Sequence, residues 1–153
     1  MSELLEQEIF EEDTLANKFL NFRVDSSTYG IELRNVTEII GIQPITPVPD
    51  VPDYIRGVIN LRGSITPVMD VRLRFKKGFK EYNDRTCVIV INIHGKSLGM
   101  IVDSVSEVIT IPETEIVPPP EMGKEDKFIK GVGKVGNEVV LLLDCEKILN
   151  IEI

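Results

Sequence analysis

The sequence has no tryptophan, one histidine, two cysteines and only 6% aromatic residues. A zinc site needs several cysteine or histidine ligands at short spacing, so these numbers argue against a metal centre. Proteins that bind nucleic acid combine a basic stripe with stacking aromatic residues, whereas this chain carries a net charge of −8. The composition therefore favours neither a metalloprotein nor a nucleic-acid-binding protein.

Long apolar runs and a basic leader are also missing. No run approaches the roughly 20 residues that a membrane-spanning helix needs. The amino-terminal stretch MSELLEQEIFEEDTL is acidic, unlike a secretory or transit peptide. Cys87 and Cys145 lie far apart inside apolar runs. We therefore expect two reduced, buried thiols in a cytoplasmic protein without membrane insertion.

What the chain does have is the composition of one globular domain, with 42% hydrophobic and 27% charged residues. Residues 54–75, YIRGVINLRGSITPVMDVRLRF, hold two apolar runs joined by Arg62-Gly63-Ser64. Two such runs around a short glycine-containing segment predict a β-hairpin. Arg62 places a permanent charge in this turn, as a simple solvated residue or as part of a binding site.

The sequence repeats itself. With a shift of 69, residues 21–42 align with residues 90–111, so that Gly30 falls on Gly99 and Glu38 on Glu107. With a shift of 74, residues 54–70 align with residues 128–144 and Gly57 falls on Gly131. Proline-rich connections, residues 43–53 and 112–127, absorb the difference between the two shifts. Such self-similarity indicates a duplicated unit of short strands.

Five short strands with hairpin connections bury one face by curling into a barrel. The sequence thus predicts an all-β fold of two pseudo-repeated, five-stranded SH3-like β-barrels that share a hydrophobic junction, with short helices at the ends. We expect an acidic tail or short helix in residues 1–16, a first barrel with its linker in residues 17–83, and a second barrel with a carboxy-terminal helix in residues 84–153. Because a unit of about 70 residues is marginal alone, the two should form one cooperative domain.

Catalytic chemistry finds no support in the motifs. His94 occupies a turn, Ile93-His94-Gly95-Lys96, without a second histidine or a cysteine beside it. No phosphate-binding glycine loop or dinucleotide fingerprint occurs. Asp70 and Asp144 precede short helical segments and are typical of helix N-caps. We expect a binding module that is not an enzyme and needs no cofactor or metal.

The segments GVINLRGSITPVMDVR, YGIELRNVTEIIGI and IVDSVSEVI resemble the CheW-like domain family of bacterial chemotaxis, and the resemblance runs over residues 19–149. It implies a non-catalytic adaptor that ties the histidine kinase CheA, through its regulatory domain, to the cytoplasmic tips of methyl-accepting chemotaxis receptors. It also implies a monomer when free. The receiver domain that accompanies some family members has no room in this chain.

The resemblance further implies two sets of contact residues. The receptor-facing set comes from both repeats and comprises Val36, Glu38, Arg62, Cys87 and Gly99, to which we add Ile65 as an apolar anchor for a docked helix. The kinase-facing set comprises Ile39, Ile42, Arg56, Val117 and Met122, of which the last two match positions for a second kinase contact although their side chains depart from the family. Two alternatives remain: a small-ligand or oligonucleotide-binding β-barrel, and an enzyme whose site is built from both repeats.

Overall fold

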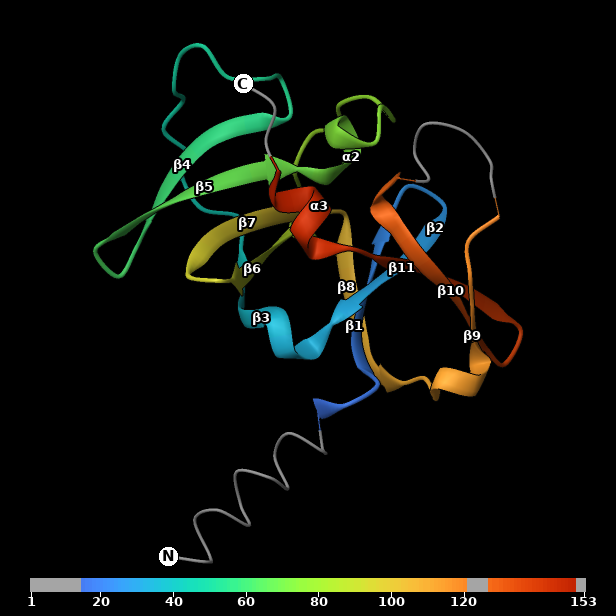
Figure 1. Ribbon diagram of the computed structural model, residues 1–153. Helices are drawn as coiled ribbons and strands as arrows, with labels where there is room; N and C mark the ends of the chain where they lie inside the picture. Colours follow the sequence, from blue (N-terminus) through green and yellow to red (C-terminus); the bar gives the residue numbers. More distant parts are fainter. Residues whose placement is uncertain (1–14, 121–126, 151–153) are drawn as a thin grey trace, which may run out of the picture.

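The computed structural model describes residues 15–120 and 127–150. Within them the chain forms two β-sheets with short helices at their borders (Figure 1). The elements are β1 (Lys18–Val24), β2 (Ser27–Glu32), η1 (Leu33–Asn35), β3 (Val36–Gly41), β4 (Ile55–Leu61), β5 (Ser64–Asp70), α2 (Val71–Arg74), β6 (Cys87–Ile93), β7 (Lys96–Val102), β8 (Ser104–Thr110), η2 (Glu113–Glu115), β9 (Ile116–Val117), β10 (Ile129–Val135), β11 (Glu138–Leu143) and α3 (Cys145–Leu149). The predicted all-β fold class is confirmed. Most of the predicted tail, residues 1–16, lies outside the described residues.

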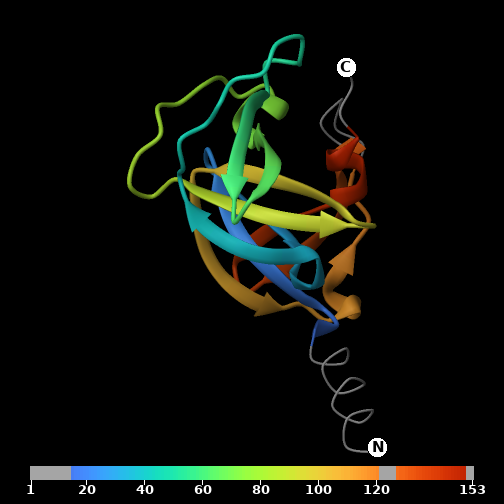
Figure 2. The same ribbon diagram turned by 90° about the vertical axis from the view of Figure 1, so that its left-hand side faces the viewer.

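The two sheets show the duplication in their strand order. The five-stranded sheet runs β3-β6-β7-β5-β4, and the six-stranded sheet runs β8-β1-β2-β11-β10 with the short β9 added at its edge. The repeat pairs β1 with β6, β2 with β7, β3 with β8, β4 with β10 and β5 with β11, so the two orders are equivalent. The five-stranded sheet faces the viewer after the rotation in Figure 2.

The strand order corrects the predicted division at residue 83. The six-stranded sheet takes β1 and β2 from the first repeat and β8 to β11 from the second, and the five-stranded sheet takes β3 to β5 from the first and β6 and β7 from the second. The two repeats have thus exchanged their first hairpins. Residues 17–83 and 84–153 are repeats of sequence, and neither one makes a barrel by itself.

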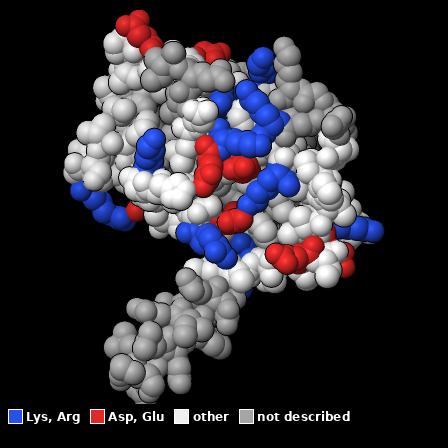
Figure 3. All heavy atoms as spheres, viewed as in Figure 1, with Lys and Arg blue, Asp and Glu red and all other residues white. Residues whose placement is uncertain are grey.

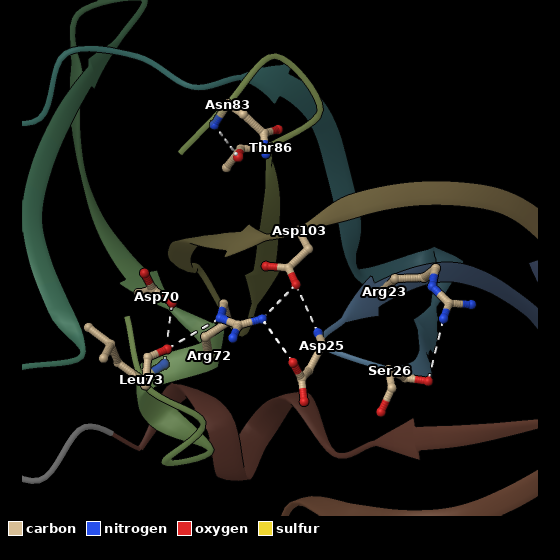
Figure 4. Close-up of polar contacts among 10 residues, drawn as sticks. Arg23, Asp25, Ser26, Asp70, Arg72, Leu73, Asn83, Thr86 and Asp103 are labelled. Atoms are coloured by element: carbon tan, nitrogen blue, oxygen red, sulfur yellow. Dashed lines mark hydrogen bonds and ion pairs between the residues drawn. The ribbon is translucent and has the colours of Figure 1, made fainter. Parts of the chain in front are cut away.

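Two short connections carry the chain from one sheet to the other. Residues Leu33–Asn35 form a 3-10 turn between β2 in one sheet and β3 in the other. Asp103 is the single residue between β7 and β8, and its carboxylate accepts hydrogen bonds at 2.8 Å from the backbone N–H of Asp25 and from Arg72 Nη1. Arg72 also lies 3.5 Å from the Asp25 carboxylate, and Figure 4 shows the guanidinium between the two carboxylates. This cluster fixes the crossing between the sheets.

The apolar side chains form three cores. In β6, Val88 and Val90 point into the five-stranded sheet's own interior, while Ile89, Ile91 and Ile93 point into the junction with the other sheet. A third core fills the interior of the six-stranded sheet, around Phe19, Ile111, Val140 and Leu142. Alternation with both faces buried explains why CVIVINI reads as an almost unbroken apolar run.

The predicted local signals are confirmed. Arg62-Gly63 and His94-Gly95 are the two-residue turns of the hairpins β4–β5 and β6–β7, with positive φ at every position (53° and 86°, 53° and 82°), as type I′ turns require. Asp70 caps α2 by accepting from the Leu73 N–H. Asp144 caps α3 by accepting from the N–H groups of Glu146 and Lys147. No helix among the described residues has the length and apolar character to cross a membrane.

Gly99 gives a direct test of how tightly the five-stranded barrel is packed. A Cβ there would lie 2.8 Å from Val88 Cγ1 and 2.9 Å from Val68 Cγ1, both on buried valines. We expect Gly99→Ala to lower the free energy of unfolding in urea by about 1–3 kcal/mol through overpacking. Gly41→Ala is the matched control, because nothing lies within 4 Å of a Cβ at Gly41. Equal stability of the two variants would contradict this packing.

Candidate functional site

Arg62 and Glu38, two residues of the predicted receptor-facing set, contact each other. Arg62 Nη1 donates to Glu38 Oε2 at 2.5 Å, with the arginine side chain 80% exposed and the glutamate side chain 22% exposed. Glu38 belongs to β3 and Arg62 follows β4, and these strands are the opposite edges of the five-stranded sheet. Their contact shows that the sheet curls until its edges meet. Inside, Ile40 of β3 and Leu61 of β4 pack against the same core.

The other receptor-facing candidates divide into surface and partly buried positions. Ile65 lies three residues beyond Arg62 on β5 and is 66% exposed, an unusual degree for an isoleucine in a strand. Val36 opens β3 and packs partly against the junction core. Cys87 also packs against that core but pairs with Gly41 at the other end of β3. Glu38 and the hairpin tip with Arg62 and Ile65 thus meet at one end of the sheet, whereas Cys87 lies at the other end of β3.

Gly99 does not belong to that surface. It is a buried residue of β7, and its missing side chain would point at Val68 and Val88 in the interior of the barrel. Its repeat partner Gly30 likewise faces Val140 and Leu142 inside the six-stranded sheet. The prediction that Gly99 contacts the receptor is therefore corrected: this glycine is required by packing in both repeats.

Three of the kinase-facing candidates lie on the outside of the five-stranded sheet. Ile39 and Ile42 are exposed at β3 and just after it. Arg56, on β4, places its guanidinium carbon 5.1 Å from the centre of the Phe79 ring. An isolated antiparallel β-bridge between Thr46 and Val58 places the segment that follows Ile42 beside β4. All three candidates thus lie on a strand of the five-stranded sheet or directly after one.

The remaining two candidates do not join them. Val117 is exposed on β9, at the outer edge of the six-stranded sheet, and therefore lies on a different sheet from Ile39, Ile42 and Arg56. Met122 lies outside the described residues. Any contact at Val117 is consequently separate from the surface around Ile42.

The structure offers little for catalysis or ligand chemistry. His94 Nε2 lies 2.9 Å from Glu146 Oε1, and both side chains are exposed where the β6–β7 turn meets α3. Within residues 15–120 and 127–150, no group of three or more His, Cys, Asp and Glu side chains is placed to hold a metal ion. Among the described residues, apolar side chains fill the interiors of both barrels, and this packing gives the small-ligand alternative no support.

Sequence reasoning missed Phe79. This residue lies in the polar connection between α2 and β6, is 54% exposed, and meets the Tyr82 ring edge-on at 5.5 Å. Burial, followed by a hydrogen bond to Asp70, raises the pKa of the Tyr82 hydroxyl above its ordinary value. The hydroxyl therefore stays protonated and donates to that carboxylate. Phe79 lies in a basic connection without periodic apolar positions, so the sequence gives no sign that its side chain is exposed beside Arg56.

The charge pattern agrees with a protein-binding role. Figure 3 shows lysine and arginine side chains interspersed with aspartate and glutamate over one face of the molecule. A phosphate backbone requires a continuous basic stripe, which this face lacks. The oligonucleotide alternative receives no support from it.

Residues 18–152 match the family model of the CheW-like domain. The chain belongs to the CheW-like domain family. It is 36% identical to the chemotaxis protein CheW of Klebsiella aerogenes, over 92% of this chain and 86% of that protein. It is 37% identical to the chemotaxis protein CheW of Bacillus subtilis, over 88% of each.

A solved structure agrees with this membership. The scaffolding protein TtCheW from Thermoanaerobacter tengcongensis superposes with a TM-score of 0.79 at 34% identity, over 84% of this chain and 88% of that one. Members of the CheW-like family are non-catalytic scaffold or adaptor proteins. The predicted family, the all-β fold class and the non-catalytic adaptor function in bacterial chemotaxis are confirmed. The residues that make the contacts remain predictions.

The two cysteines of this CheW-like chain should react very differently. Burial raises the pKa of the Cys145 thiol to about 12, so only about one thiol in ten thousand is ionised at pH 8. Cys87 is half-buried. We expect iodoacetamide to label Cys87 of the native protein at pH 8 and to label Cys145 only after unfolding. Mass spectrometry of the single variants Cys87→Ala and Cys145→Ala measures the two rates, and equal native rates would contradict the burial of Cys145.

Proposed function

We propose that this chain is a cytoplasmic adaptor that couples the histidine kinase CheA to the cytoplasmic tips of chemoreceptors. Membership of the CheW-like family supports the proposal. The observation that carries it is the presence of two exposed surfaces on one rigid sheet, one around Arg62 and Ile65 and one around Ile39 and Ile42. An adaptor needs two such surfaces, because it has to hold two partners at once.

The receptor-facing surface comprises Val36, Glu38, Arg62 and Ile65, with Cys87 beside the other end of β3. Ile65 offers apolar area worth about 25 cal/mol for each Å² buried. A receptor tip is a helical hairpin by the family resemblance, and a helix docks through apolar anchors on one face. Arg62, already held toward Glu38, has further guanidinium donors for a carboxylate or carbonyl of that helix. Burial of Ile65 would then provide affinity, and the bond from Arg62 would fix the position of the receptor helix along the surface.

The kinase-facing surface comprises Ile39, Ile42 and Arg56. β3 is an edge strand of its sheet, and edge strands with apolar side chains favour pairing with another sheet or barrel. Because side chains alternate along a strand, Ile39 is exposed while Glu38 and Ile40 are partly buried. Val117, on β9, is proposed as part of a separate second kinase contact.

Each surface has a variant that should disable it alone. Arg62→Asn removes the charge and keeps a residue that tolerates the φ of 53°. We expect it to weaken binding of a receptor-tip fragment about 5- to 30-fold, as for loss of a charge-assisted bond, without loss of kinase binding. Ile42→Glu should do the reverse, because it places a charge in an apolar contact. Titration calorimetry against the receptor fragment and the CheA regulatory domain measures both.

The turn of the hairpin β6–β7, which has the same conformation, provides a matched control for the arginine. His94 has the same φ of 53° and is also followed by glycine, so His94→Asn repeats the backbone change without touching either surface. We expect it to bind both partners as the unaltered protein does. The assignment of Arg62 fails if Arg62→Asn and His94→Asn bind the receptor fragment equally well.

We also propose that the adaptor is monomeric when free and unfolds as one cooperative unit. Each barrel contains strands from both repeats, and one apolar junction joins them. Calorimetric unfolding should show a single transition with equal calorimetric and van't Hoff enthalpies. Fragments of residues 17–83 and 84–153 should each lack cooperative unfolding, because each lacks the hairpin held by the other. Two separate transitions would contradict this expectation.

A further inference from the structure

The segment from α2 to the start of β6 is basic, although the protein as a whole is acidic. Residues 71–86 contain six basic residues against two acidic ones, in a chain of net charge −8. Two of the arginines are already engaged. Arg72 bonds with Asp103, and the Arg74 guanidinium carbon lies 4.2 Å from the ring centre of Tyr54 and 4.6 Å from that of Phe128. The lysines of this connection remain available.

Those lysines flank the exposed Phe79 in the sequence. Lys76 and Lys80 are exposed and Lys77 is half-buried, and among the described residues none of the three forms an ion pair. Arg56 reaches Phe79 from β4. We call the surface of Arg56, Lys76, Lys77, Phe79 and Lys80 the basic–aromatic surface. Arginine and large aromatic residues are the types enriched at the centres of protein interfaces.

This connection is held in one conformation by hydrogen bonds at several points. Arg72 Nε donates to the Gly78 carbonyl at 3.2 Å, and the Tyr82 hydroxyl donates to Asp70 Oδ2 at 2.8 Å. Asn83 N donates to Thr86 Oγ1 at 2.9 Å, as drawn in Figure 4. A surface that is already ordered loses little conformational entropy when a partner binds. The residues are therefore displayed in advance of binding.

The basic–aromatic surface continues the surface around Ile42. Cys87, the first residue after the connection, pairs with Gly41, the residue before Ile42. Arg56 belongs to both surfaces, and Figure 2 shows the chain between α2 and β6 returning to the sheet beside the end of β3. A partner docked at Ile42 thus has Phe79 and the lysines within the same contact area.

We propose that the basic–aromatic surface extends the kinase contact and binds an acidic segment of CheA that carries an apolar side chain. This rests on the proposed function, since it assigns the partner of the same sheet. The lysines attract the acidic groups, and Phe79, backed by Arg56, receives the apolar side chain. A protein partner is favoured over a lipid surface because the patch has one exposed aromatic residue and the chain as a whole is acidic.

The test separates charge from apolar contact. We expect Lys76→Glu/Lys80→Glu to weaken binding of the CheA regulatory domain about 10-fold at low salt and far less at 0.5 M salt, since screening removes the attraction. Phe79→Ser should weaken it about 5- to 30-fold at either salt concentration. The charge control is Lys96→Glu/Lys134→Glu, two exposed lysines on β7 and β10. The apolar control is Val139→Ser on β11, where the side chain is 56% exposed.

The binding measurements distinguish failure of this extended kinase contact from failure of the proposed adaptor function. If Ile42→Glu abolishes kinase binding while the Lys76/Lys80 and Phe79 variants bind normally, the extension is wrong and the adaptor function stands. If the unaltered protein fails to bind the CheA regulatory domain, the proposed function itself is wrong. A separate assay measures binding to vesicles of phosphatidylglycerol and phosphatidylcholine. Binding to these vesicles that the lysine variants lose, with kinase binding unchanged, would assign the surface to lipid and overturn the proposal.

Discussion

The apolar junction between the two sheets is the constraint on which the rest of the molecule depends. The side chains of Ile89, Ile91 and Ile93 on β6 point into this junction, while those of Val88 and Val90 point into the interior of the five-stranded barrel. A strand buried on both faces can occupy only the centre of a two-sided core. Because the hairpins are exchanged between repeats, forming this junction and closing each barrel are one event. The packing of this apolar junction also holds the strands that carry the outer surfaces in place.

Much of this fold could be predicted from the sequence, because the signals were local or repeated. The two-residue turns, the N-caps Asp70 and Asp144, and the equivalence of the two repeats all follow from residue types at fixed spacing. The exchange of hairpins could not be predicted. The alternation of apolar residues shows which face of a strand is buried, but not which strand lies beside it. The pattern in β1 would be the same if β1 paired with β3 of its own repeat or with β8, the equivalent of β3 in the other repeat.

The site was predicted less completely, for the same reason. Arg62 could be singled out from the sequence because it places a permanent charge in a hairpin turn, and the structure adds that its partner is Glu38. Gly99 was wrongly assigned to the receptor surface because a glycine has no side chain whose polarity indicates a buried or an exposed face; in the fold, a Cβ at this position would meet Val68 and Val88. Phe79 was missed because its importance depends on Arg56, which is remote in sequence and near only after folding.

The closeness of the two proposed surfaces bears on how a protein without catalytic groups could connect two partners. Glu38 and Ile39 are neighbours on β3, and their side chains leave the strand in opposite directions, one toward Arg62 and one to the outside. β3 is a short strand hydrogen-bonded to β6, whose two faces are both buried. Packed cores resist continuous deformation, so a force at one side of β3 is passed to the other as displacement of the whole body. Under the proposed function, coupling through such a strand would need no internal switch: the adaptor would fix the distance and angle between its two partners, and a change in the receptor would reach the kinase as a change in position.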